Sequence, residues 1–492
     1  MLSKNAAMIF GILSSSGRQT VSDLMRRTKL SQPMISRGLN EVGLMDNLII
    51  HRDGRGFVYA LAKQIRSLPI KIPVYHIGAG NPASQGAGNP ASQGESVDSL
   101  EAKIIGSLSA LVGGGFSFCD NNGKTHLFDG MPWFLQDIRP QGYLGRAFCH
   151  THATSLELSH SLGEWSDDDA LFALSMLGGD APGNLIVGSG SLSKVTAMPE
   201  CEPNRYDEIA ELLVAGTLPG SSAGGEHPKF VSGNRIVKFS PVLDGSAVSL
   251  RWSDLLVSEH CAAAVLSAHG VLAADNRIVI SQRRCYLESI RYDRAGSFGR
   301  IGVVSIGAID DEFVGERRNW TATAKKLVSL RLLASDAARE IDTIEQFGRL
   351  IGNTDMHFGN LSFFFDGPPL SQFPASDDTG SPALEGSKTK LPAALRLAPV
   401  YDMLPMRYAP EKGEIVERFV APIESDNQLS IEMAISFWLK VKNHDLISES
   451  FREIAIANLC ALEGAYHVDV ASNSVSELSE AGNVSGFRLG RR

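Results

Sequence analysis

The stretch Gly352-Asn-Thr-Asp-Met-His-Phe-Gly-Asn360 carries the strongest structural signal in the chain. It follows an apolar helix-like segment that ends Phe347-Gly-Arg-Leu-Ile351, and it precedes an apolar strand-like segment, Leu361-Ser-Phe-Phe-Phe365. An Asp and an Asn five residues apart on such a loop are typical of phosphoryl-transfer catalytic loops. Asp355 would orient the accepting hydroxyl and take its proton, while Asn360 would bind Mg²⁺. A polar turn made of turn-forming residues is the alternative.

A second carboxylate stands 42 residues beyond Asn360. In Arg396-Leu-Ala-Pro-Val-Tyr-Asp-Met-Leu-Pro405, Asp402 follows an apolar stretch. Mg²⁺ takes one or two protein carboxylates together with phosphate oxygens and water, so Asp402 suits a metal site shared with Asn360. Taken alone, Asp402 could equally be a capping residue in a turn.

A glycine-rich segment precedes both motifs. Pro219-Gly-Ser-Ser-Ala-Gly-Gly-Glu-His-Pro-Lys229 has small residues that let backbone N–H groups approach phosphate oxygens. Lys238 follows in a strand-like Ile-Val-Lys-Phe, where it could contact phosphates, and Glu259 in a helix-like segment could pair with it. The segment is neither a Walker A motif nor a dinucleotide-binding fingerprint, and most glycine-rich segments are simple turns.

The charge of the chain is unevenly distributed. The net charge is −9, which argues against a protein that coats nucleic acid or anionic membranes as a whole. Residues 1–66, however, hold ten Lys or Arg and four Asp or Glu, a local net of +6. The six cysteines form no C-x-x-C pair, and no run of about 18 apolar residues occurs. We therefore expect a cytoplasmic protein without a membrane partner.

The basic N-terminal segment has the pattern of a winged helix-turn-helix. Three helix-like segments are followed by two apolar strands around Arg52-Asp-Gly-Arg-Gly56, a hairpin turn. The third helix, from Ser31, would enter the major groove of DNA. A solvated surface or a protein-interaction module is the alternative. The predicted DNA contacts are Gln32, Ser36, Arg37, Arg52 and Arg55.

Polar and repetitive stretches divide the rest of the chain. The eight residues at 78–85 are repeated without change at 86–93, which indicates a surface loop, and a polar insertion spans about 366–390. We predict a winged helix-turn-helix at 1–66, a linker with the duplicated loop at 67–98, a small subdomain at 99–220, a kinase N-lobe at 221–300, a helical C-lobe at 301–470 and a flexible tail at 471–492.

Taken together, these motifs resemble the HipA family of serine/threonine kinases over roughly residues 125–465. The catalytic loop and the Tyr-Asp motif, in this order, are the specific part of the resemblance. The matching segments are Asn353–Asn360, Leu397–Asp402, Ser222–Lys229, Glu288–Arg294 and Asp168–Gly183.

The resemblance implies an α+β, bilobal protein-kinase-like fold with a helical C-lobe, here preceded by the winged helix-turn-helix. It implies ATP and Mg²⁺ as cofactors, with Asp355 catalytic, Asn360 and Asp402 binding the metal, and Ser222 autophosphorylated. It also implies a protein substrate, with an aminoacyl-tRNA synthetase as one candidate, growth inhibition, and a HipB-like antitoxin as a partner. The implied ATP contacts are Gly224, Gly225, Lys229, Lys238, Ile290, Arg291, Tyr292, His357, Asn360, Tyr401 and Asp402.

Three features depart from the family pattern. Ile290 stands where a glutamate is usual, and the segment between Asn360 and Asp402 is long. A winged helix is fused in front, whereas the family often relies on a separate helix-turn-helix antitoxin. The alternative function is a catalytically silent kinase-fold regulator that acts on transcription through its winged helix.

Overall fold

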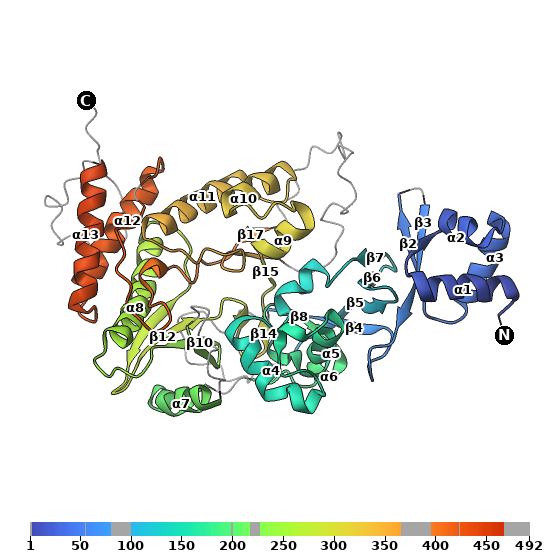
Figure 1. Ribbon diagram of the computed structural model, residues 1–492, viewed down its shortest axis with the longest axis horizontal. Helices are drawn as coiled ribbons and strands as arrows, with labels where there is room; N and C mark the ends of the chain where they lie inside the picture. Colours follow the sequence, from blue (N-terminus) through green and yellow to red (C-terminus); the bar gives the residue numbers. More distant parts are fainter. Residues whose placement is uncertain are drawn as a thin grey trace, which may run out of the picture.

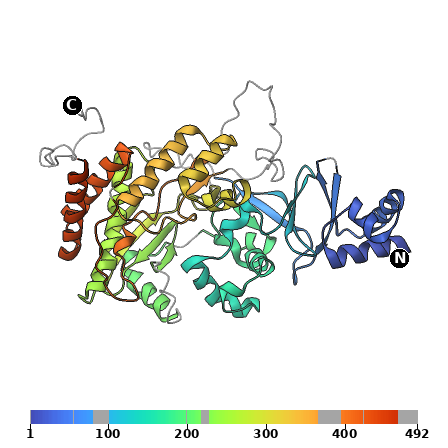
Figure 2. The same cartoon turned by 45° about the horizontal axis from the view of Figure 1, so that its top comes forward.

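The computed structural model describes residues 2–54, 56–79, 100–197, 200–216, 227–365, 395–422 and 424–466. The chain is a mixed α and β protein whose N-terminal helices lie at one end, with the C-terminal helices at the other (Figures 1 and 2). Within the described ranges, no helix combines the length and the apolarity needed to span a bilayer.

Three helices and a hairpin form the N-terminal body. Thr20 and Asp23 form a capping box at the start of α2, in which each side chain accepts the other's backbone N–H. Ile9, Leu24, Ile35 and Leu39 are buried between the helices. The elements are α1 (Lys4–Ser16), β1 (Gln19–Thr20), α2 (Val21–Thr28), α3 (Gln32–Gly43), β2 (Leu48–Asp53) and β3 (Gly56–Lys63).

The next body continues the sheet of the first. Strand β3 pairs with β5, so one eight-stranded sheet joins the two bodies. Five of its strands lie in the order β1-β3-β5-β4-β8, while β2 pairs with β3, β6 with β5 and β7 with β6. Residues 72–77 lie within the predicted linker but form β4, which pairs with β5 and β8. The strands are β4 (Ile72–Ile77), β5 (Ala102–Leu111), β6 (Phe116–Asp120), β7 (Thr125–Phe128) and β8 (Leu185–Val187).

Helices pack against this sheet. Three aspartates open the helix α5, where negative charge is favoured by the helix dipole, and Asp168 pairs with Lys63 of β3. The helices are η2 (Trp133–Ile138), α4 (Gly142–Leu156), η3 (Leu162–Glu164), α5 (Asp167–Leu177), η4 (Gly178–Asp180) and α6 (Ser189–Leu192).

A four-stranded antiparallel sheet, in the order β11-β12-β10-β9, forms the third body. Alternate residues of a strand face opposite sides. Val237 and Phe239 therefore pack with Tyr206 on one side, while Lys238 faces Glu259 on the other. The elements are η5 (Pro203–Arg205), α7 (Tyr206–Gly216), β9 (Lys229–Ser232), β10 (Arg235–Phe239), α8 (Ala247–Ala268), β11 (Asn276–Ile280) and β12 (Cys285–Ile290).

The fourth body is mainly helical, and its small sheet, in the order β15-β16-β17, flanks the loop 351–361. That loop joins a helix to a strand, as the sequence predicted. The elements are β13 (Arg294–Ala295), β14 (Gly299–Arg300), β15 (Val303–Ser305), α9 (Ile306–Phe313), α10 (Trp320–Ser329), α11 (Ser335–Leu350), β16 (Ser362–Phe364), β17 (Arg396–Leu397), η7 (Met406–Tyr408), α12 (Gln428–Asn443) and α13 (Glu449–Tyr466).

Candidate functional site

Two amide side chains hold the predicted catalytic loop. Asn353, which is buried, accepts a hydrogen bond from the backbone N–H of Asp355 through Oδ1 (3.0 Å). Asn360 donates from Nδ2 to the backbone oxygen of Asp355 (2.8 Å). The backbone of Asp355 is thus fixed from both sides. Such fixing keeps a catalytic carboxylate in one geometry.

The same asparagine reaches the second motif. Asn353 donates from Nδ2 to the backbone oxygen of Asp402 (3.3 Å). Asp402 has a φ of +53°, a left-handed conformation that is uncommon for residues other than glycine and clusters at functional sites. Asn353 therefore connects the segments that carry Asp355 and Asp402, although the sequence places them almost fifty residues apart.

The side-chain oxygens of Asn360 and Asp402 fit a Mg²⁺ site by their chemistry. Because Nδ2 of Asn360 is used inside the loop, its amide oxygen is the atom left for a ligand, and no hydrogen bond to that oxygen occurs in the described part of the chain. An amide oxygen and a carboxylate are hard ligands of the kind that Mg²⁺ prefers.

A buried lysine joins this loop to the four-stranded sheet. Lys238 Nζ lies 2.6 and 2.7 Å from the two carboxylate oxygens of Glu259, and it also donates to Asp402. Burial lowers the pKa of Lys238, while the neighbouring carboxylate of Glu259 opposes that shift. The predicted pairing of Lys238 with Glu259 is confirmed.

A buried imidazole with one unpartnered nitrogen lies beside this lysine. His227 packs against Trp252, with ring centroids 4.6 Å apart, and its Nε2 makes no hydrogen bond to the residues that the structure describes. Burial, together with the charges of Lys238 and Lys229, holds the pKa of His227 well below its usual range. A buried polar atom without a partner costs free energy, so this atom fits a site that receives an anionic group such as phosphate.

The predicted adenine-binding segment lies at the end of β12. The N–H groups of Ile290 and Arg291 donate to the backbone oxygens of Asp275 and Asn234, both at 2.8 Å, and the backbone oxygen of Arg291 accepts from the N–H of Arg294 (3.3 Å). Among the described residues, the backbone oxygen of Ile290 is therefore the group left for a ligand at these two positions. The ring of Tyr292 lies 5.9 Å from that of Tyr401. Burial raises the pKa of Tyr401 to about 12. Its hydroxyl donates to the backbone oxygen of Gly359 in the catalytic loop.

A network of charged side chains, buried at Arg291 and Asp293 and exposed at Asp180, connects the segment 290–292 to the middle of the chain. Asp180, at the end of η4, accepts hydrogen bonds from Arg291 and Arg294, both at 2.9 Å. Arg291 also pairs with Asp293 (3.0 Å), and Arg300 donates to the backbone oxygen of Ala181 (3.0 Å). The side chain of Arg291 therefore holds the segment 290–292 to the end of η4, and only the backbone of Arg291 belongs to the predicted ATP site.

The remaining predicted residues fall into three groups. Lys229 begins β9 opposite Lys238, and His357 is exposed on the catalytic loop. Gln32, Ser36 and Arg37 are exposed on α3, and Arg52 is exposed on β2. Ser222, Gly224, Gly225 and Arg55 lie outside the described residues, as do most of the duplicated loop, the insertion at 366–390 and the tail at 471–492.

Sequence reasoning missed three residues of this site: Asn353, His227 and Asp180. Asn353 and His227 stood inside quoted motifs, where an amide or imidazole next to a predicted catalytic or phosphate-binding residue was the available signal. Asp180 carried no local signal, because its partners come more than a hundred residues later.

Comparison with known proteins places the chain in a family. Residues 98–196 match the model of the YjjJ-like toxin middle domain, and residues 221–463 match that of the HipA-like C-terminal domain. Toxin YjjJ of Escherichia coli (strain K12) is 33% identical over 462 residues, covering 89% of this chain and 94% of that protein. The chain belongs to the YjjJ-like toxins. The resemblance to the HipA family is thereby confirmed.

Two solved structures are similar to this YjjJ-like toxin. One is a chain of the Shewanella oneidensis MR-1 complex of HipA, HipB and operator DNA, with a TM-score of 0.48 and 16% identity over 74% of this chain and 95% of that chain. The other is the Helicobacter pylori proinflammatory kinase CtkA, with a TM-score of 0.31 and 12% identity over 49% of this chain and 88% of that chain.

Proposed function

We propose that the protein is an ATP-dependent serine/threonine protein kinase with a bilobal kinase-like fold. The observation that carries the proposal is the junction of Lys238, Glu259 and Asp402, which Asn353 links to Asp355. A lysine paired with a helix glutamate, a catalytic aspartate and two metal ligands are the parts that protein kinases require.

Each residue has a defined role in this proposal. Asp355 orients the hydroxyl of the substrate and accepts its proton, and Lys238, Lys229 and the loop with Gly224 and Gly225 hold the phosphates. His357 adds a phosphate contact. The backbone at 290–292 and the ring of Tyr401 hold the adenine. Bound Mg²⁺, held by Asn360 and Asp402, would neutralise the charge that develops on the phosphates.

Transfer of labelled phosphate from ATP tests the assignment. The full chain is incubated with Mg²⁺ and γ-labelled ATP, and Asp355→Asn is compared with the wild type. We expect the variant to lose on the order of 10²–10³ in rate, because it keeps the loop but cannot accept a proton. Equal incorporation in both proteins would exclude this function.

The wider role follows from the family. We propose that the kinase acts in the cytoplasm, phosphorylates itself on Ser222 and a cellular protein, with an aminoacyl-tRNA synthetase as a candidate, and thereby inhibits growth. A HipB-like antitoxin is a candidate partner, since the similar Shewanella structure is a HipA, HipB and operator DNA complex.

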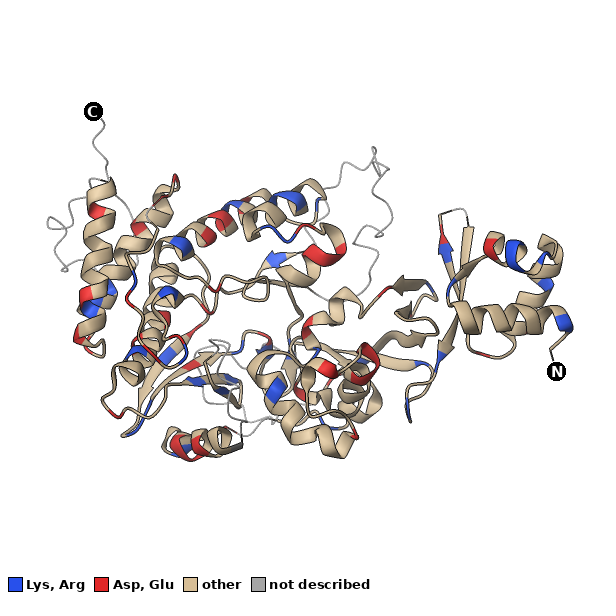
Figure 3. Ribbon diagram, in the orientation of Figure 1, with Lys and Arg blue, Asp and Glu red and all other residues tan. Residues whose placement is uncertain are grey.

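A second function is DNA binding by the N-terminal body as a winged helix. Lys and Arg lie on α2 and on the β2–β3 hairpin (Figure 3), and Gln32, Ser36 and Arg37 are exposed near the start of α3. The start of such a helix reaches base edges in helix-turn-helix complexes. If phosphoryl transfer fails its test, a DNA-bound regulator without catalysis is the function that this body favours.

A further inference from the structure

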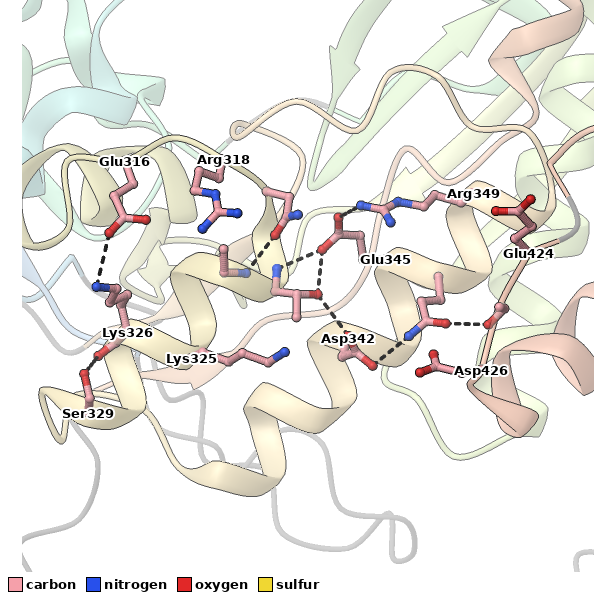
Figure 4. A pocket seen from close by; sticks show the side chains of 15 residues that line it. Glu316, Arg318, Lys325, Lys326, Ser329, Asp342, Glu345, Arg349, Glu424 and Asp426 are labelled. Carbon is pink, nitrogen blue, oxygen red and sulfur yellow. Dashed lines mark hydrogen bonds and ion pairs between the residues drawn. The ribbon is translucent and has the colours of Figure 1, made fainter.

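A polar groove lies between α10, α11 and residues 424–426 (Figure 4). The side chains on the floor of this groove are hydrogen-bonded to one another. Glu345, which is buried, accepts hydrogen bonds from the backbone N–H (2.8 Å) and the hydroxyl (2.6 Å) of Thr321. Asp342 accepts from Gln346 (2.9 Å), and Gln346 in turn accepts from Ser425. The hydrogen bonds hold the walls of the groove together, which makes it a preformed surface.

The rim differs from the floor. Arg318, Lys325, Glu424 and Asp426 are exposed, and within the described ranges none of the four takes part in an ion pair or a side-chain hydrogen bond. The two cations lie on α10 and just before it, whereas the two carboxylates lie at the opposite end of the groove (Figure 4). The rim therefore offers positive charge at one end and negative charge at the other.

An exposed aromatic side chain lies five residues before Glu424 of the rim. Phe419 is 87% exposed, yet its backbone oxygen accepts hydrogen bonds from Arg407 Nε (3.0 Å) and the Tyr408 hydroxyl (3.4 Å). The backbone N–H of Arg407 donates to Gly352 (2.9 Å), which begins the catalytic loop. The exposed ring of Phe419 is thus available to bury apolar surface of a bound segment.

We propose that the groove and Phe419 dock an extended segment of the protein substrate at a distance from the residue that is phosphorylated. The inference rests on the proposed kinase function. Acidic side chains of the segment pair with Arg318 and Lys325, basic ones pair with Glu424 and Asp426, and an apolar one packs on Phe419. Charges of opposite sign at opposite ends match an extended peptide and not a small ion.

The walls of the groove are connected directly to the catalytic loop, so docking would bring the substrate close to Asp355. Helix α11 lines the groove with Asp342, Glu345 and Arg349, and three residues beyond Arg349 the chain enters the catalytic loop at Gly352. On the other wall, Trp320 donates from Nε1 to the backbone oxygen of His357 (3.3 Å). A segment bound here would raise the local concentration of a tethered serine near Asp355 without touching the ATP site.

A binding assay tests the groove without any catalysis. Fluorescein-labelled peptides of about 14 residues, which span up to ~50 Å when extended, carry two Glu at one end and two Arg at the other. The comparison peptide has the same composition with alternating charges. We expect the full chain to bind the block peptide about tenfold more tightly, by fluorescence polarisation, with an affinity that falls as salt rises.

Reversing the charge of the rim carboxylates tests whether they contact the peptide. Glu424→Lys with Asp426→Lys should weaken block-peptide binding about tenfold, and a peptide with Glu at both ends should regain it. The matched control is Asp445→Lys with Glu453→Lys, which reverses two exposed carboxylates elsewhere and should change nothing. Equal affinity for block and alternating peptides overturns the proposal. The proposal is also overturned if the peptide binds a chain truncated after Tyr466 but not the full chain, because residues 467–492 would then be the occupant of the groove.

A kinetic assay separates failure of docking from failure of the kinase. The block peptide is fused to a serine-containing target, and phosphate transfer is measured with varied target. We expect KM to rise about tenfold in the Glu424→Lys, Asp426→Lys variant while kcat stays within about twofold. An unchanged KM overturns docking alone. No transfer to any target by the wild type overturns the kinase function, while the binding assay still reports on the groove.

Discussion

Lys238 Nζ lies 2.6 Å from Glu259 Oε1, which ties β10 to α8 inside the protein. Both side chains are almost fully buried, and Asp402 provides a second carboxylate to the same ammonium group. A buried charge that loses its partner is costly, so the lysine is held in one position by two elements that belong to different parts of the site. The position of Lys238 therefore depends on α8 as well as on the segment that carries Asp402.

The first prediction concerns this pair. Glu259→Gln should lower kcat/KM for ATP-dependent phosphate transfer on the order of 10²-fold, because Lys238 then pairs with Asp402 alone and is drawn away from the phosphates. Initial rates at varied ATP measure the effect. Glu449→Gln, at an exposed position on α13, is the matched control. A kcat/KM equal to that of the wild type would show that the pair is only structural.

The second prediction concerns Asp180, which joins the YjjJ-like middle domain to the segment proposed to hold adenine. Asp180→Asn weakens the hold on Arg291 and Arg294, so we expect KM for ATP to rise about tenfold with kcat within about twofold. The Asp180 side chain is 42% exposed, and the loss of folding stability should therefore stay below ~1 kcal/mol. If kcat falls and KM does not change, Asp180 acts on the catalytic loop instead.

The third prediction concerns Ser222. Incubation with ATP and Mg²⁺ should place phosphate on Ser222, and the added charge of about −2 should weaken ATP binding by the glycine-rich loop. Peptide mass spectrometry locates the phosphate, and Ser221→Ala is the control that leaves Ser222 intact. Phosphate at other positions, with none on Ser222, would contradict the prediction. The Asp355→Asn protein should carry none, which separates autophosphorylation from modification by another kinase.

The sequence predicted those parts of the site whose signal lies within a short, continuous stretch of the chain. The helix–loop–strand around Asp355, the strand of Lys238 and the helix of Glu259 each follow local apolar patterns. The tie between Asp180 and Arg291 joins residues more than a hundred positions apart and had no local pattern. Proline is rare in central strands because it has no N–H to donate, yet Pro73 lies within β4. The pairing of β4 with β8 covers Val74, Tyr75 and His76, and the backbone oxygen of Pro73 accepts from the N–H of Gly188 (2.8 Å), so the missing N–H falls at the end of this ladder.

The fourth prediction is a pH dependence of stability at Asp254. This buried carboxyl on α8 accepts hydrogen bonds from the N–H (2.7 Å) and the hydroxyl of Ser448, yet burial raises its pKa to about 6. The folded protein then binds more protons at this site than the unfolded chain between about pH 4 and 6, so this group's contribution to stability falls as pH rises through that window.

The test compares the wild type with Asp254→Asn, which cannot ionise. The free energy of unfolding of the wild type, relative to the variant, should fall by up to ~3 kcal/mol from pH 4 to pH 6 and stay level above that. Urea denaturation at a series of pH values measures it. A constant difference across the series would mean that Asp254 ionises normally in the folded protein.

The fifth prediction concerns the N-terminal body. Arg37 is exposed on α3 and Arg52 on β2, where in winged-helix proteins the recognition helix and the wing meet DNA. We expect the full chain to bind duplex DNA from upstream of its own gene, with an affinity that falls steeply as salt rises, because each phosphate contact releases condensed counterions.

Arg37→Ala with Arg52→Ala should reduce the slope of log affinity against log salt by about two. Lys412→Ala with Lys440→Ala removes two exposed cations in the C-terminal part of the chain and should leave the slope unchanged. Gel-shift titrations at several salt concentrations measure both slopes. DNA binding that is unchanged by the arginine substitutions, or no binding at low salt, would leave this body as a protein-interaction module.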